Sequence, residues 1–365
     1  MAIAKRKKYS IDTPEISTVT KDLRGKAILV YGSNSLGKTK QATRACKPYY
    51  LPFEAGINAI SGVNFLPLHN KWSNFKKINK QLTDPRKLEK NKEKYQTIIF
   101  DTVFAASMMC QDYLCQKNGV EDISKGNKGY GLWKDYQTEF WKEINKLTNS
   151  GYTVYFISHE GQRTFTDEEG EDYTKIFPTG DTRSIDPIID LCDIVLYLKP
   201  NGLDKSGQEK LSSAFMVNTK EYLARSRFDY MQTKLEEFTI ENLEEAIRLA
   251  VEKEEEVNGK QAVTTFEEQK VELIEEEMPF DELVAEIKRY ATMLFKLDRF
   301  EEYTDITNEY LGDGKGVGEA KETQKQQLEM ILFDLEDEYE DTLEGYEYNL
   351  EDADDENEDE DDDEE

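Results

Sequence analysis

Short apolar segments alternate with longer amphipathic segments along the first two thirds of the chain. The apolar segments have the length and composition of buried strands, and they cover residues 27–31, 49–53, 97–101, 153–158, 194–198 and 214–219. Between them, stretches such as 131–147 repeat their apolar residues at helical spacing. Short strands separated by helices of this length predict an α/β fold with a mostly parallel sheet.

Three further segments have patterns of their own. The sequence RTFTDEEGEDYTKIF predicts a β-hairpin that turns at residues 168–171. After Lys234, the sequence TIENLEEAIRLAVEKEEE predicts a helix with Thr239 or Asn242 as its N-cap. Further on, FDELVAEIKRYATMLFKL and QKQQLEMILFDLEDEY have apolar helical periodicity and are joined through GDGKGVG. They predict a small helical domain.

Charge separates the two parts of the chain. Residues 1–233 contain 35 Lys and Arg against 28 Asp and Glu, a net charge of +7, whereas residues 234–365 contain 12 against 48, a net charge of −36. The last 15 residues include 13 acidic ones, and such a run repels itself and predicts disorder. We therefore divide the chain into a basic lead-in (1–25), an α/β domain (26–233), a helix with a charged linker (234–279), a helical domain (280–347) and a disordered acidic tail (348–365).

Composition also argues against several classes of protein. Four cysteines without a C-x-x-C pair and only two histidines suggest neither a zinc site nor a disulfide framework. The basic N-terminus MAIAKRKKYS lacks the apolar core of a signal peptide, and no apolar run approaches the roughly 18–20 residues of a membrane span. We expect a cytoplasmic protein without a membrane partner.

Residues 32–39 match the phosphate-binding pattern G-x-x-x-x-G-K-[ST] at every fixed position. The candidate nucleotide-binding residues are Gly32, Ser33, Asn34, Ser35, Leu36, Gly37, Lys38, Thr39 and Lys40. Glycines let backbone N–H groups turn inward around the phosphates, Lys38 supplies charge to the β- and γ-phosphates, and the Thr39 hydroxyl coordinates Mg²⁺. An apolar strand precedes the loop and a helix at 40–46 follows it, which is the context that a P-loop requires. The sequence predicts binding of ATP and Mg²⁺.

Other predicted strands end in polar residues that suit the same chemistry. Asp101 follows the apolar run of YQTIIFDTV and is the expected metal-organising aspartate. Glu54, which ends YYLPFE, is the candidate for orienting the attacking water, with a solvated turn residue as the alternative. His159, in TVYFISHE, is either a γ-phosphate sensor or a structural hydrogen-bond partner.

Two arginines follow the last predicted strand in LARSRF. Arg225 or Arg227 could reach the γ-phosphate of a neighbouring subunit and act as an arginine finger. The alternative is that both are solvated surface residues.

Together these segments resemble the RecA-like ATPases of phages, in particular the phage nucleotide-binding AAA proteins that include short RecA-core single-strand annealing proteins. The resemblance covers about residues 20–233 and is carried by YGSNSLGKT, LPFEAG, IIFDT, VYFISHE, DLCDIVLYL and NTKEYLARSRF. It implies a RecA-type core that binds ATP and Mg²⁺, assembles into a ring or filament, and handles single-stranded DNA. It also implies that Glu54 activates water and that Arg225 or Arg227 lies at the subunit interface. The acidic segment TDEEGED after His159 departs from a basic DNA-binding loop.

Two segments are candidates for DNA contact. The sequence HNKWSNFKKINK interleaves aromatic and basic residues, which suits base stacking and phosphate neutralisation; the residues are Lys71, Trp72, Phe75, Lys76, Lys77 and Lys80. The other segment is the N-terminal cluster Lys5, Arg6, Lys7 and Lys8. In each case the alternative is structural, because the aromatic residues could belong to the core and the lysines to a solvated face.

Four functions remain open. The first is a DNA-dependent ATPase of recombination, annealing or replication, and the second is a helicase loader or motor-type ATPase. The third is a scaffold that ATP switches without turnover, and the fourth is a small-molecule or nucleotide kinase. The acidic tail either competes with nucleic acid for the basic body, recruits a replication or recombination protein, or aids solubility.

Overall fold

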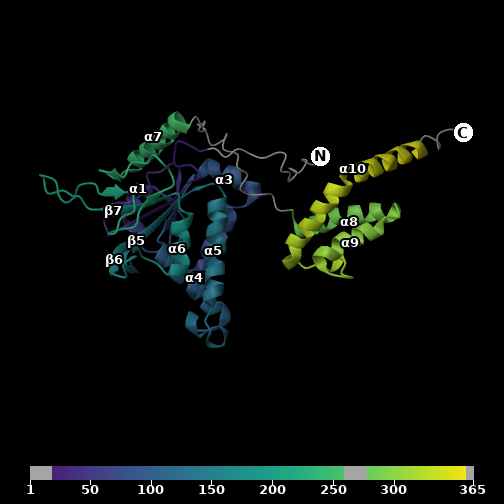
Figure 1. Cartoon of the computed structure of the whole chain (residues 1–365), viewed down its shortest axis with the longest axis horizontal. Helices are drawn as coiled ribbons and strands as arrows, with labels where there is room; N and C mark the ends of the chain where they lie inside the picture. Colours follow the sequence, from purple (N-terminus) through teal and green to yellow (C-terminus); the bar gives the residue numbers. More distant parts are fainter. Residues whose placement is uncertain (1–18, 259–277, 359–365) are drawn as a thin grey trace. The chain divides into compact units, whose positions relative to one another are not determined.

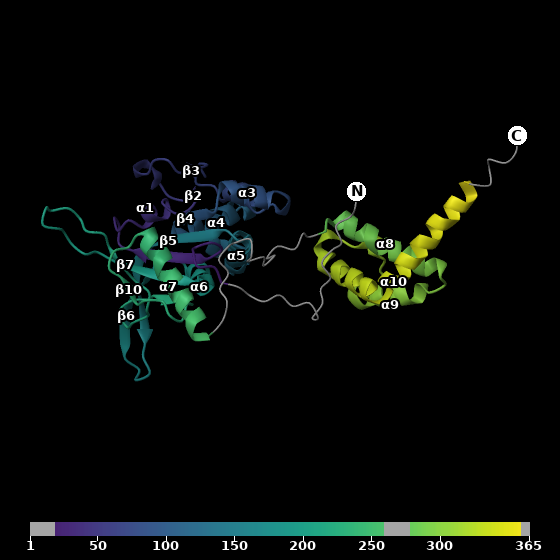
Figure 2. The same cartoon turned by 90° about the horizontal axis from the view of Figure 1, so that it is seen from above.

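The structure is a computed structural model that describes residues 19–258 and 278–358. Contacts within the chain divide it into two units, Met1–Glu275 and Glu276–Glu365, which Figures 1 and 2 show from two directions. Within the described ranges, no helix combines the length and the apolar character that crossing a membrane requires.

The first unit is built around a sheet whose strands follow the order β10-β8-β7-β1-β5-β4-β2-β3. The strands β7, β1, β5, β4, β2 and β3 run parallel to one another, β8 is antiparallel to its neighbour β7, and β10 is antiparallel to β8. Two more strands lie off this path, because β6 pairs with β5 and β9 pairs with β7. The bounds are β1 Ala27–Gly32, β2 Pro48–Pro52, β3 Asn64–Phe65, β4 Thr97–Asp101, β5 Thr153–Thr166, β6 Asp172–Pro178, β7 Ile194–Lys199, β8 Ser213–Phe215, β9 Arg225–Ser226 and β10 Lys234–Leu235. The prediction of a mostly parallel α/β fold is confirmed.

Helices cover both faces of this sheet, so its central strands are buried on both sides. In β1, Leu29 and Tyr31 belong to one apolar cluster and Ile28 and Val30 to another, as the alternation of side chains along a strand dictates. The first cluster includes residues of α2 (Trp72–Leu82), α3 (Leu88–Lys94), α4 (Val103–Asn118), α5 (Trp133–Asn149) and α6 (Thr182–Leu191). The second includes residues of α1 (Lys38–Ala42) and α7 (Ile240–Asn258). Figure 1 shows α7 on one side of the sheet and α4, α5 and α6 on the other.

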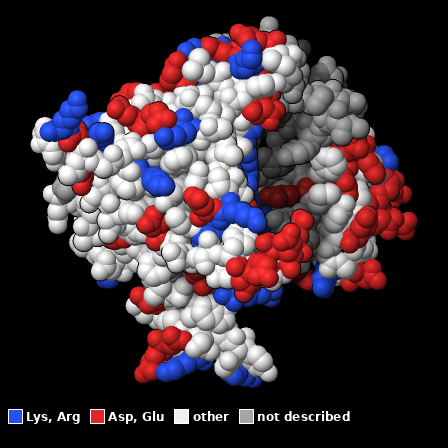
Figure 3. Space-filling model, turned by 60° about the vertical axis from the view of Figure 1, so that its left-hand side comes forward, with Lys and Arg blue, Asp and Glu red and all other residues white. Residues whose placement is uncertain are grey.

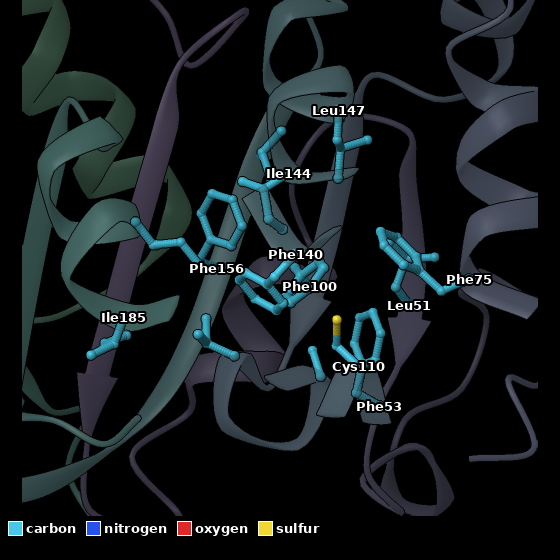
Figure 4. Close-up of a cluster of buried hydrophobic side chains, with 14 of the residues drawn as sticks. Leu51, Phe53, Phe75, Phe100, Cys110, Phe140, Ile144, Leu147, Phe156 and Ile185 are labelled. Carbon is cyan, nitrogen blue, oxygen red and sulfur yellow. The ribbon is translucent and has the colours of Figure 1, made fainter. Parts of the chain in front are cut away.

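The aromatic residues of α2 lie inside the first cluster. Trp72 is 1% exposed and Phe75 is completely buried. The Trp72 ring stacks on Phe140 of α5 with their centroids 5.5 Å apart, and Figure 4 shows Phe75 beside Phe53 and Phe100. The prediction that Trp72 and Phe75 stack on DNA bases is therefore wrong for this structure. The helical spacing of Trp72, Phe75, Ile78 and Leu82 places all four on the face that packs on the sheet.

Trp72→Ala should lower the free energy of unfolding by about 3–5 kcal/mol, because it removes a large buried side chain and leaves a cavity. Urea denaturation followed by circular dichroism measures this loss. Lys77→Ala, at an exposed position of the same helix, is the matched control and should change stability by less than about 0.5 kcal/mol. Equal midpoints for the two variants would contradict the buried position of Trp72.

The β5–β6 hairpin is confirmed, and it is longer than its sequence pattern indicates. β5 continues past residue 158 to Thr166, and it pairs with β6 from Glu160↔Pro178 to Thr166↔Asp172. By contrast, the strand predicted at 214–219 ends at Phe215. It ends early because a turn follows, in which the Thr219 hydroxyl accepts hydrogen bonds from the backbone N–H groups of Glu221 and Tyr222.

One predicted helix differs from the observed one at both ends, and for another the structure confirms one of its two candidate N-caps. The helix expected at 40–46 is α1, which starts at Lys38 and ends at Ala42; after it, Arg44 and Ala45 form three-residue turns back to Gln41 and Ala42. For α7, the structure selects Thr239 as the cap, because its hydroxyl accepts a hydrogen bond of 3.1 Å from the Asn242 N–H.

Among its described residues, the second unit has three α-helices packed around a separate apolar core, α8 (Phe280–Lys296), α9 (Phe300–Leu311) and α10 (Lys325–Glu358), and two short 3-10 helices, Val317–Glu319 and Glu322–Gln324. The prediction of a small helical domain is confirmed. The acidic run predicted to be disordered from residue 348 begins instead as the end of α10, which continues to Glu358. Extending an existing helix adds one hydrogen bond per residue without a new nucleation step. Residues 359–365 lie outside the described residues, as do Lys5, Arg6, Lys7 and Lys8.

Candidate nucleotide-binding site

The phosphate-binding loop connects β1 to α1 at the carboxyl edge of the sheet. Gly32 ends β1 with a φ of 152°, and a Cβ there would lie 2.8 Å from the Leu198 carbonyl oxygen. Gly37 has a φ of 81°, which L-residues with side chains rarely adopt. Both fixed glycines of the motif are therefore required by the backbone. Asn34, Ser35 and Lys40 are exposed, while the Leu36 carbonyl accepts a hydrogen bond of 2.9 Å from the Ser212 hydroxyl.

Lys38 is folded back over this loop. Its ammonium Nζ donates to the carbonyl oxygens of Gly32 at 2.8 Å and Ser33 at 2.7 Å. Burial lowers the pKa of the Lys38 ammonium, whereas the nearby carboxylates of Asp101 and Glu160 raise it. The side chain is thus held within the loop where the phosphates of a nucleotide would be bound.

Thr39 and Asp101 provide the oxygen atoms that suit a magnesium ion. The Thr39 hydroxyl donates to Asp101 Oδ2 at 2.7 Å, and the Tyr50 hydroxyl donates to the same oxygen at 3.0 Å. Burial raises the pKa of the Asp101 carboxyl, which is 3% exposed. No cluster of three or more His, Cys, Asp or Glu suited to a metal occurs among the described residues. A hydroxyl, a carboxylate and phosphate oxygens nevertheless fit Mg²⁺, which usually binds through few protein ligands. The ion would neutralise charge on the phosphates.

Glu54 and His159 face each other beside this pair. Glu54 Oε1 lies 3.4 Å from His159 Nε2, and Glu54 Oε2 accepts a hydrogen bond of 3.1 Å from the Thr102 hydroxyl. The hydrogen bond with His159 is the largest influence on the pKa of the Glu54 carboxyl and holds it below its usual value. The Glu54 side chain is 39% exposed, so water can reach a carboxylate that stays ionised.

The order of the strands explains why these residues meet. β5 lies between β1 and β4, and β2 follows β4. Gly32 pairs with His159, and Asp101 pairs with Pro52, so residues at the ends of four parallel strands lie along one edge. The structure therefore brings Lys38, Thr39, Asp101, Glu54 and His159 together, as the sequence predicted.

The comparisons with known proteins agree with this geometry. The model of the AAA domain family (AAA_24) matches residues 24–228. The chain belongs to the AAA domain family. It is also 50% identical over 327 residues, 90% of this chain and 98% of the relative, to the SPbeta prophage-derived uncharacterized protein YorG of Bacillus subtilis (strain 168). The AAA domain match and the motif at residues 32–39 make the core a P-loop NTPase, and membership of such a family implies use of a nucleotide, usually with Mg²⁺.

One solved structure with a slight likeness is the KaiC-like protein PH0186 of Pyrococcus horikoshii OT3. The TM-score is 0.29 and the sequence identity 10%, over 53% of this chain and 78% of that one. At this level the likeness carries no conclusion about the AAA domain.

The two candidate finger arginines lie away from the AAA domain's phosphate-binding loop. Arg225 pairs with Val195 at the amino end of β7, whereas the loop follows the carboxyl end of β1. The Arg225 guanidinium donates to the carbonyl oxygens of Ile189, Asp190 and Cys192, and Arg227 donates to Asp190 and Asp193. Both therefore satisfy carbonyls at the end of α6. A finger role across a subunit interface stays a prediction.

Sequence reasoning assigned no role to three residues of the site. Tyr50 and Thr102 hold the two carboxylates, and Glu160 accepts a hydrogen bond of 2.6 Å from the Ser33 hydroxyl of the loop. Glu160 directly follows His159 just after the predicted strand 153–158, so the sequence already indicated a position beside the site. Tyr50 gave no such signal, because its neighbour Tyr49 is also a tyrosine. The two side chains point to opposite faces of the sheet, and the sequence does not indicate which of them faces the site.

His159→Asn should move the acidic limb of the AAA domain's hydrolysis rate to higher pH. His159 holds the pKa of Glu54 below its usual 4.5, so its removal raises that pKa and leaves Glu54 protonated at a higher pH. A profile of kcat against pH measures the shift. His69→Asn is the matched control, because His69 is exposed and its φ of 51° suits Asn. Superimposable acidic limbs for the wild type and His159→Asn would count against the Glu54–His159 pairing.

Proposed function

We propose that this protein is a Mg²⁺-dependent ATPase that acts on single-stranded DNA in recombination, annealing or replication. The observation that carries the ATPase part is the convergence of Lys38, the Thr39–Asp101 pair and the Glu54–His159 pair at one sheet edge. These groups supply phosphate binding, a metal site and a carboxylate that can orient water. The phage setting is supported by the prophage-derived relative, and the role in DNA metabolism is supported by the resemblance that the motifs carry.

The DNA part of the proposal depends on charge rather than on base stacking. With Trp72 and Phe75 buried, the exposed lysines of this segment are Lys71, just before α2, and Lys77 and Lys80 on the helix. Figure 3 shows basic and acidic side chains interspersed on the visible face rather than gathered into one basic patch. We therefore expect DNA binding that weakens steeply as salt rises, as phosphate contacts do.

The second unit is proposed to bind protein rather than DNA. Residues 276–365 contain 7 Lys and Arg against 35 Asp and Glu, a net charge of −28. A surface of this charge repels a phosphate backbone and attracts a basic partner. We propose a replication or recombination protein as that partner, and a ring or filament of this chain as the active assembly.

An assay of ATP turnover with and without single-stranded DNA tests the proposed function. Stimulation by DNA supports it, and a double-stranded oligonucleotide of the same length is the control for specificity. Turnover that requires a small acceptor instead of DNA would make the protein a kinase. ATP binding without turnover would indicate a switched scaffold, and turnover that rises only with a helicase would indicate a loader.

A further inference from the structure

The two oxygens of the Asp101 carboxylate differ in their hydrogen bonds. Oδ2 accepts one hydrogen bond of 2.7 Å from the Thr39 hydroxyl and one of 3.0 Å from the Tyr50 hydroxyl. A carboxylate oxygen offers about two lone pairs, so these two donors fill Oδ2. Neither hydroxyl donates to the other oxygen, Oδ1. At most one oxygen of this carboxylate is therefore free for a metal ion or for water bound to it.

The Tyr50 hydroxyl is held in this position by its surroundings. Tyr50 is completely buried, and it belongs to the apolar cluster that also contains Ile99, its partner in the neighbouring strand β4. The segment after β2 passes close to the hydroxyl, because a Cβ at Gly56 would lie 3.2 Å from the Tyr50 hydroxyl oxygen and 3.9 Å from Asp101 Oδ2. A side chain at Gly56 would therefore press on the hydroxyl. Burial and this close approach keep the hydroxyl directed at Asp101.

The two hydroxyl donors differ in what they can do beside a nucleotide. Thr39 belongs to the phosphate-binding motif, and its oxygen keeps lone pairs for Mg²⁺ while its proton is donated to Asp101. Tyr50 lies outside the motif, and its buried side chain donates to the carboxylate. The effect of Tyr50 on a bound nucleotide and its cation is therefore exerted through Asp101.

A carboxylate with one free oxygen favours a small cation that needs few protein ligands. Mg²⁺ requires near-octahedral geometry and usually keeps several waters, so one or two carboxylates and the phosphate oxygens suffice to bind it. Ca²⁺ takes about six to eight oxygen ligands and often binds both oxygens of one carboxylate. With Oδ2 of Asp101 already filled, this carboxylate suits the first arrangement and not the second. Oxygen ligands alone would not separate the two cations, because both prefer them.

We propose that Tyr50 is a positioning residue that selects the metal ion: by occupying Oδ2 of Asp101, it limits this carboxylate to one free oxygen and so favours Mg²⁺ over Ca²⁺. The inference rests on the proposed ATPase function, because it requires a nucleotide and its cation at the loop. It adds a selectivity between cations, which the phosphate-binding motif does not specify.

Tyr50→Phe tests the inference, because it removes the hydroxyl and keeps the buried ring. Titration with a non-hydrolysable ATP analogue, in saturating Mg²⁺ or in saturating Ca²⁺, gives two affinities for each protein. We expect the affinity in Ca²⁺ to rise about tenfold relative to the affinity in Mg²⁺. Tyr49→Phe is the matched control. It makes the same change in the same strand, but Tyr49 belongs to the apolar cluster on the opposite face of the sheet, and the variant should keep the wild-type ratio.

Gly56→Ala is a second variant that reaches the same hydrogen bond from outside the tyrosine. The added methyl group presses on the Tyr50 hydroxyl, so the ratio of affinities should shift in the same direction and by less. This variant decides the test if circular dichroism shows that Tyr50→Phe does not fold. An unchanged ratio in the folded variant, or equal weakening with both cations, would overturn the inference and leave the ATPase proposal standing. No binding of the analogue by the wild type with either cation would overturn both.

Discussion

Lys38→Ala is expected to weaken nucleotide binding at least about 100-fold. The Lys38 ammonium donates to the carbonyls of Gly32 and Ser33, so it is already positioned inside the loop that would surround the phosphates. Each charge-assisted hydrogen bond contributes about 1.5–3 kcal/mol, and the ammonium would make more than one to the phosphates. Isothermal titration with ATP and Mg²⁺ measures the loss.

The control for Lys38→Ala is Lys90→Ala, at an exposed position of α3. It removes the same charge from a surface with no contact to the loop, and it should bind ATP as the wild type does. Circular dichroism confirms that both variants are folded. ATP binding by Lys38→Ala at the wild-type affinity would remove the assignment of residues 32–39 as a phosphate-binding loop.

The site was predictable from the sequence because its residues stand at the ends of recognisable strands. In parallel strands the carboxyl ends meet at one edge, so Gly32, Asp101 and His159 meet there once the strands are known. The motif at 32–39 adds fixed backbone requirements, and the structure shows them at Gly32 and Gly37. Local sequence and strand order therefore carry most of the information about this site.

Residues whose role depends on a tertiary neighbour were not predictable in the same way. The spacing of Trp72 and Phe75 fits both an exposed aromatic face and a buried one, and packing on Phe140 and Phe53 decides it. Arg225 follows a strand, but the structure turns its guanidinium to the carbonyls at the end of α6. These contacts join residues that are far apart in the sequence, so the hydrophobic periodicity of a single segment cannot predict them.

Glu54→Gln is expected to lower kcat for ATP hydrolysis about 100- to 1,000-fold while leaving ATP affinity nearly unchanged. Glu54 lies beside the Thr39–Asp101 pair and contacts Thr102 and His159 rather than the loop. The amide keeps the size and the hydrogen bond to Thr102, but it cannot accept a proton from water in the way a carboxylate does. A loss confined to kcat is the signature of a group that acts in the transition state.

The design of this experiment separates catalysis from binding and folding. Single-turnover hydrolysis measures the chemical step, and titration with ATP measures affinity on the same preparation. Glu93→Gln, at an exposed position near the end of α3, is the matched control and should hydrolyse ATP at the wild-type rate. If Glu54→Gln instead weakens ATP binding and leaves the chemical step intact, Glu54 is a binding residue and another group must orient the water. Glu54 is the carboxylate that contacts His159 and lies beside the Thr39–Asp101 pair. That result would therefore also require a different explanation of how ATP is hydrolysed at this sheet edge.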